Sequence, residues 1–204
     1  MKGEYSMILN ITRKLVSAKA EYHCQEINGI EGNSNYTMGI ALKKASISCS
    51  DGSMISIAEK YLPLKLLCRI LSNLIWLCPF DINIKEKNVR IHPFPISFMP
   101  KLTFRHEGTA YEIRLHTGNN VSLTQGGKQI ARYKKNDISY AGQNHYSVFH
   151  CGVIDAELLF VLCVLIDIIW FKDDTSFKFR RKEKSIVLLD RYKHMAEWMP
   201  NQEE

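Results

Sequence analysis

The feature that most restricts the fold is an apolar run over residues 158–171, whose only charged member is Asp167. A helix that is apolar on every side must be surrounded by protein or by lipid. The run is about 14 residues long, whereas a helix needs about 20 apolar residues to cross a bilayer. We therefore predict a core helix over residues 155–171 with Asp155 as its N-cap. In such a core, Asp167 would face an opening or accept a hydrogen bond from a neighbouring strand.

Most of the remaining chain is predicted to form strands. The runs at 36–48, 101–106, 111–116 and 130–133 alternate in polarity or are rich in β-branched and aromatic residues. Clusters of turn-forming residues at 31–35, 50–53, 117–120 and 125–128 punctuate the chain. Hydrophobic residues make up 46% of the 204, which is ordinary for a globular protein. The expected class is α+β, mainly β, in a single domain spanning residues 1–204.

Three segments depart from the strand pattern. Residues 63–78 carry leucines and cysteines at helical spacing after Pro63, which predicts an additional helix on a surface or across a barrel mouth. The proline-rich stretch 92–100 is expected to be a connector or an edge, because proline lacks the amide donor that a central strand needs. A C-terminal extension over 172–204 includes a predicted short helix at 186–198.

Composition favours the interior of the cell. The first residues lack the continuous apolar stretch of a signal peptide, so we expect a cytoplasmic location, peripheral to a membrane if lipid is bound. The six cysteines are scattered without close pairing and are expected to be reduced thiols. The net charge of +6 biases encounters toward phosphate-bearing surfaces, but it is too small to indicate a dedicated nucleic-acid binder.

The second half of the chain resembles a known superfamily. The resemblance spans residues 100–171 and rests on short strand and turn patterns, which are 102–108, 111–113, 121–123, 129–131 and 146–148, followed by Asp155 and the apolar helix. These patterns are similar to those of the tubby C-terminal-like superfamily, which includes phospholipid scramblases, plant LURP-one-related proteins and bacterial proteins. Among these, the chain resembles a bacterial member.

The resemblance implies a closed antiparallel β-barrel of about 12 strands around one central hydrophobic helix. That helix is the one predicted independently from the apolar run. The helix at 63–78 and the extension at 172–204 have no counterpart that we can match in the superfamily. They are therefore expected to be peripheral additions.

No recognisable catalytic or metal-binding pattern is present. Adjacent His150 and Cys151 would point to opposite faces of a strand and could not share a proton. His145 and the His23-Cys24 pair lack metal-ligand spacing, so no metal or other cofactor is expected. The chain is predicted to be non-enzymatic. An enzyme of unrecognised type would instead show a polar pocket with convergent histidine and carboxylate groups.

Two basic clusters are the remaining binding candidates. The first follows a glycine turn and the second follows the core helix; their members are Lys128, Arg132, Lys134 and Lys135, and then Lys178, Arg180, Arg181, Lys182 and Lys184. In an extended strand, Lys178, Arg180, Lys182 and Lys184 would share one face, where they could bind phosphates of lipid head groups. A solvated edge strand protected by its charge is the alternative explanation.

The sequence thus predicts a tubby-like ligand-binding or scaffold protein with anionic phospholipid as its expected ligand. The alternative is a bacterial protein-interaction module, such as a regulator or an immunity-type partner, that uses residues 63–78 or 186–198.

Overall fold

The structure, a computed structural model, describes residues 7–16, 19–24, 30–35, 44–49, 54–60, 79–85, 87–93, 101–116, 119–136 and 143–171. These residues form twelve strands and one helical segment. The strands are β1 (Met7–Val16), β2 (Lys19–Cys24), β3 (Ile30–Asn35), β4 (Lys44–Cys49), β5 (Met54–Glu59), β6 (Phe80–Ile84), β7 (Lys87–Pro93), β8 (Lys101–His106), β9 (Thr109–Leu115), β10 (Asn120–Gln125), β11 (Lys128–Lys135) and β12 (Gln143–His150). The predicted class, α+β and mainly β, is confirmed.

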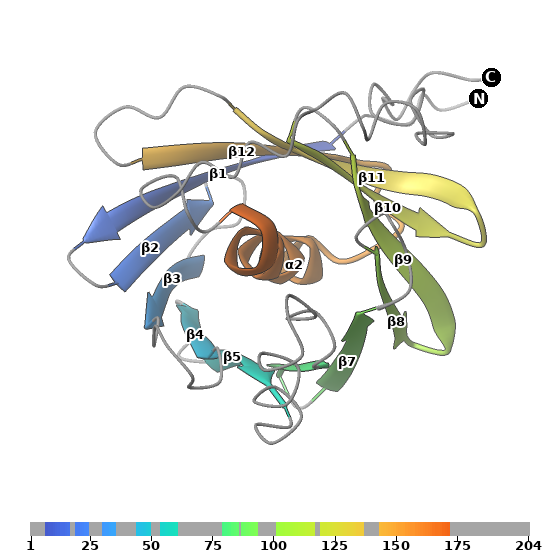
Figure 1. Ribbon diagram of the computed structural model, residues 1–204, viewed down its shortest axis with the longest axis horizontal. Coiled ribbons are helices and arrows are strands. Elements are labelled where there is room, and N and C mark those ends of the chain that lie inside the picture. The colour runs from blue at the N-terminus through green and yellow to red at the C-terminus, as the bar shows by residue number, and fades with distance from the viewer. Residues whose placement is uncertain are drawn as a thin grey trace, which may run out of the picture.

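The strands form one antiparallel sheet that curls around the helix (Figure 1). Strands that are consecutive in the chain are neighbours in the sheet, and β1 pairs with both β2 and β12, so the strand order closes on itself. The pairing is longest between β1 and β12, with eight residue pairs. It is shortest between β3 and β4, where Ile30 lies opposite Cys49 and Glu31 opposite Ser48.

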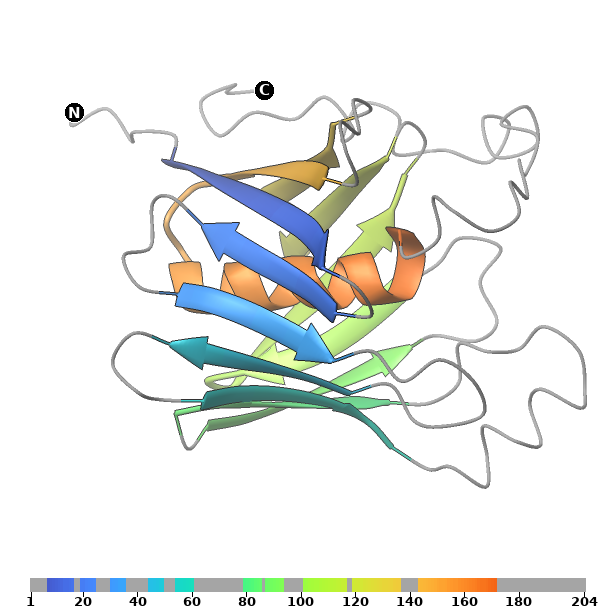
Figure 2. The same ribbon diagram turned by 90° about the vertical axis from the view of Figure 1, so that its left-hand side faces the viewer.

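The apolar run forms the central helix α2 (Ala156–Ile166), which continues as the π-helical turn η1 (Asp167–Phe171). Figure 2 shows the helix running through the middle of the molecule with strands above and below it. Every residue from 158 to 169 is buried. The core helix predicted at 155–171 is therefore confirmed, with Asp155 at the N-cap position but without a side-chain capping bond.

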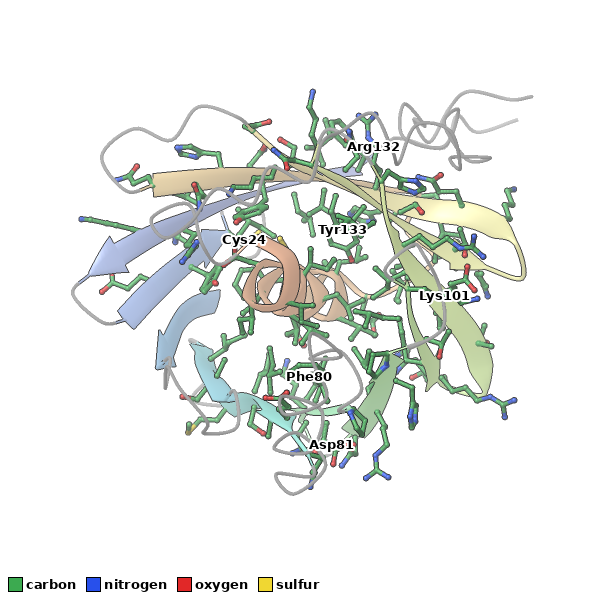
Figure 3. All side chains as sticks on the ribbon, in the orientation of Figure 1. Cys24, Phe80, Asp81, Lys101, Arg132 and Tyr133 are labelled. Carbon is green, nitrogen blue, oxygen red and sulfur yellow. The ribbon has the colours of Figure 1, made fainter. Side chains whose placement is uncertain are left out.

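Inward and outward side chains alternate along the strands because successive residues of a strand point to opposite faces. On β12, Tyr146 and Val148 are fully buried, whereas Ser147 and Phe149, the residues that follow each of them, are partly exposed. Figure 3 shows Cys24, Phe80 and Tyr133 on the helix side of the sheet, and Asp81 and Arg132 on its outer side. The inward residues and α2 together form one hydrophobic core.

Two hairpins have two-residue turns in which both residues have positive φ. Gly126 and Gly127 have φ values of 57° and 85°, as the predicted turn at 125–128 requires. Glu107 and Gly108 form the other turn, with φ values of 50° and 79°. We did not predict this second turn, because a glutamate at positive φ is uncommon.

The predicted turn at 31–35 is wrong, since these residues belong to β3 and pair with β2 at five positions. Main-chain pairing with an established neighbour outweighs the weak strand propensity of glycine and asparagine. The predicted strand at 101–106 matches β8, and 130–133 lies within β11. The predictions for 36–43, 50–53, 63–78, 94–100 and 172–204 lie outside the described residues.

Candidate functional site

The helix occupies the space in which other barrels hold a ligand. Barrels of lipocalin type bind small molecules in their interior, but here α2 packs against the inward side chains of the strands. Leu159, Val161 and Val164 on the helix have no exposed surface. While the helix fills the interior, a ligand site has to lie on the outer wall of the barrel.

One polar cluster lies inside this core, around Asp167. The Tyr22 hydroxyl donates a hydrogen bond to Asp167 Oδ2 at 2.5 Å, and the Tyr146 hydroxyl donates one to Oδ1. Arg13 Nε lies 3.3 Å from Oδ2. The four side chains come from β1, β2, β12 and η1, and they are buried together. Burial, reinforced by the Asp167 charge, raises the pKa of Tyr146, so its hydroxyl stays a donor.

The Asp167 cluster joins the helix to the barrel wall. All four of its side chains are buried, so a ligand in solution does not reach them in this conformation. The prediction that Asp167 accepts a hydrogen bond from a neighbouring strand is confirmed, twice over. We did not predict Arg13 as the positively charged partner of Asp167. The available signal was that Arg13 continues the inward alternation of Leu9 and Ile11, which places a positive charge in the core where a carboxylate must compensate it.

The structure places the first predicted basic cluster on β11. Lys128 is exposed at the hairpin, and Lys134 is exposed on the outer wall. Arg132 shares the outer wall, with its guanidinium 4.6 Å from the centre of the Phe149 ring. Lys135 is only 7% exposed and alternates with these residues, so it faces the interior and does not join them. The second cluster, at 178–184, lies outside the described residues.

Basic and apolar side chains meet on the outer wall across β11, β12 and β1. Phe149 lies opposite Arg132 on one side and opposite Ile8 on the other. Ile8 is 41% exposed, which is unusual for a large aliphatic residue in this structure. We call Ile8, Phe149, Arg132 and Lys134 the β11–β1 face.

A groove lies elsewhere on the outer wall, over β7, β8, β9 and β10. Its volume is about 720 Å³, and its polar lining includes Asn88, Arg90, His92, Arg105, Glu112 and Arg114. We call it the β7–β10 groove. Its polar lining residues come from strands that are neighbours in the sheet. The sequence did not reveal the groove, because the side-by-side placement of these residues depends on strand registers that no local pattern encodes.

Each carboxylate in and beside the groove is shared by two basic side chains. Asp81 accepts from Arg90 at 2.8 and 3.2 Å and lies 3.1 Å from Lys60 Nζ. These contacts, above all the hydrogen bonds from Arg90, hold the pKa of Asp81 below its ordinary value. Glu112 contacts both Arg114 and Lys101. Burial opposes ionisation of Glu112, but the bonds from Arg114 and Lys101 outweigh it and lower its pKa.

Among the described residues, two histidines lie within hydrogen-bond distance of a side-chain hydroxyl: His145 Nδ1 is 3.2 Å from Thr12 Oγ1, and His116 forms the shorter contact, with Ser122. His116 Nε2 lies 2.7 Å from Ser122 Oγ. Both side chains are buried, at 6% and 1% exposure, so a substrate cannot reach the hydroxyl in this conformation. His150 is buried at the end of β12, whereas Cys151 follows the strand and is partly exposed, so the prediction that both belong to one strand is wrong. No group of three potential metal ligands occurs within the described part of the chain.

Comparison with known proteins gives no match to a family model, to a curated protein or to a solved structure. The tubby-like resemblance thus stays a prediction. Among the described residues, no helix combines the length and the apolar character needed to cross a membrane.

Proposed function

We propose that the protein is a non-enzymatic, tubby-like binding protein that attaches to anionic phospholipid through the outer wall of its barrel. The observation that carries this proposal is the filled interior. Because α2 occupies the barrel from within, recognition has to use outward side chains. Attachment of this kind would make the protein peripheral to a membrane, and we expect it to act on the cytoplasmic side.

The β11–β1 face has the two components that interfacial binding requires. Arg132 and Lys134 supply positive charge, and each basic residue near an anionic membrane contributes about 1 kcal/mol. Ile8 and Phe149 supply apolar surface beside that charge. Apolar contact with the acyl boundary adds to electrostatic attraction in peripheral membrane proteins.

Co-sedimentation with vesicles tests the proposal. The protein should bind phosphatidylcholine vesicles that contain about one fifth phosphatidylserine, and rising salt should weaken that binding. Charge reversal with Arg132→Glu and Lys134→Glu should weaken binding at least 30-fold, on the order of the loss of two contacts of about 1 kcal/mol each. Circular dichroism should show that the double variant keeps its strand content.

Two further variants locate the site. Lys14→Glu with Arg105→Glu makes the same charge change at exposed outward positions on β1 and β8, and should retain more of the binding. Reversal at Arg180, Arg181 and Lys182 tests the second predicted cluster. If the Arg132/Lys134 and Lys14/Arg105 double variants lost equal amounts of vesicle binding, net charge alone would explain the effect. Salt-insensitive binding, or none, would refute the proposal.

A further inference from the structure

The β7–β10 groove carries more positive charge than its own carboxylates compensate. Five basic side chains lie in or beside it, namely Lys60, Arg90, Lys101, Arg105 and Arg114, against the two carboxylates of Asp81 and Glu112. The described side chains in and beside the groove thus carry three more positive than negative charges. The lining is unlike a solvated face on which charges of both signs alternate.

Arg105 is the one of these five basic residues that takes no part in the ion pairs of Asp81 and Glu112. Its side chain is exposed, and it forms no ion pair within the described residues, whereas Arg90 and Arg114 each hold a carboxylate. Ile91 lies opposite Phe104 in the antiparallel pair of β7 and β8. Continuing this register by one residue places Arg90 opposite Arg105, and both side chains are on the outer side of the sheet. Like charges at facing positions of a sheet destabilise it, and an anion between them would remove that cost.

Small residues leave room beside this arginine pair. Ala110 lies opposite Arg105 on β9, and Gly126 and Gly127 follow at the end of β10. No atom lies within 4 Å of a Cβ placed on either glycine, so the space is open. Asn88 and Thr103 add uncharged hydrogen-bonding groups to the lining. A volume of about 720 Å³ lies within the range of small-molecule sites.

We infer that the β7–β10 groove is a second binding site, for a small soluble molecule that carries a phosphoryl group, with Arg105 as its anchoring cation. Guanidinium groups bind phosphate oxygens in a bidentate manner. The dianion of a phosphate monoester matches the charge excess better than a single carboxylate does. A nucleic-acid strand is disfavoured because Phe104 and Tyr111, the aromatic residues of the lining, stack on each other and are buried.

Isothermal titration of the full chain with inorganic phosphate and with glycerol 3-phosphate tests this inference. Saturable binding is expected for both. Arg105→Ala should weaken it by about 10- to 100-fold, the usual effect of losing a charge-assisted contact. Arg105→Lys should restore part of the affinity by keeping the charge without the fork geometry. Lys128→Ala, which removes another exposed charge, from the β10–β11 hairpin, should change little.

The ligand panel separates the possible sources of the phosphoryl group. Glycerophosphoglycerol, a phosphodiester head group, should bind more weakly than glycerol 3-phosphate, and tighter binding would make this a lipid site and overturn the inference. Acetate that binds as well as phosphate would also overturn it, as would equal phosphate affinity in Arg105→Ala and Lys128→Ala. Phosphate binding should survive Arg132→Glu with Lys134→Glu, so the groove and the proposed membrane face can fail separately.

Discussion

At the scale of single residues, the most consequential feature is the carboxylate of Asp167 in an otherwise apolar core. A buried charge is tolerated only when it is paired and hydrogen-bonded. Arg13 supplies the opposite charge, and the Tyr22 and Tyr146 hydroxyls supply hydrogen bonds. A buried ion pair of this kind contributes little net stability, yet the loss of one partner leaves the other charge uncompensated.

Asp167→Asn should therefore destabilise the protein strongly. The amide keeps the shape of the side chain but removes the buried negative charge that lies 3.3 Å from the Arg13 guanidinium, at a cost of about 3–5 kcal/mol. Urea unfolding followed by circular dichroism gives the free energy of unfolding. The double variant Arg13→Met with Asp167→Leu should lose much less, because it removes both charges. A single variant as stable as the wild-type protein would show that the pair is not needed.

The sequence predicted one of the four members of this cluster. Asp167 was identifiable because it is the single charge within an apolar run. Its partners were not identifiable, because Arg13, Tyr22 and Tyr146 all lie more than 20 residues away in the chain. Only the folded barrel brings them together around Asp167. The same limitation hid the pairing of Arg90 with Asp81 and the position of Arg105 in the groove.

At the scale of elements, the glycine turn between β10 and β11 shows what local chemistry decides. Both residues have positive φ, the conformation of a type I′ turn, which favours asparagine at the first position and glycine at the second. Because a Cβ at either position meets no atom within 4 Å, substitutions there report backbone preference alone.

Gly126→Asn and Gly127→Ala should consequently shift stability in opposite directions. Asparagine tolerates the φ of 57° and restricts the unfolded chain, so Gly126→Asn should be neutral or stabilising by up to about 1 kcal/mol. Alanine at a φ of 85° is strained, and Gly127→Ala should cost about 1–2 kcal/mol. Thermal unfolding of the two variants measures both effects. Equal effects of the two substitutions would contradict the turn geometry.

Elements were predictable from sequence where their own pattern decides them. The apolar run gave the central helix, and the alternation at 101–106 gave β8, without any tertiary information. The turn predicted at 31–35 failed because pairing with β2 extends a segment whose composition favours a turn. The change from α- to π-helix at Asp167 also has no local signal that we recognise.

At the scale of the whole molecule, the barrel and its helix form one core, so a buried titratable group at the barrel's end is linked to the stability of the entire fold. His150 ends β12 just before the chain turns toward α2, and it is 3% exposed. The Gly152 amide donates to His150 Nδ1 at 3.3 Å, which fixes a neutral ring with its proton on Nε2. Burial lowers the pKa of His150 from its ordinary value of 6.5.

Acidification should destabilise the barrel through His150. Because the folded-state pKa is lowered, the unfolded chain takes up the proton more readily, and stability declines as the pH falls below about 6.5 and toward the folded-state pKa. His150→Gln keeps a polar side chain but does not titrate. Its urea midpoint should therefore fall less than that of the wild-type protein between about pH 7.5 and about pH 5.5, a range above the titration of most carboxylates. Parallel midpoint curves for the two proteins would show that His150 is protonated equally easily in both states, which its burial argues against.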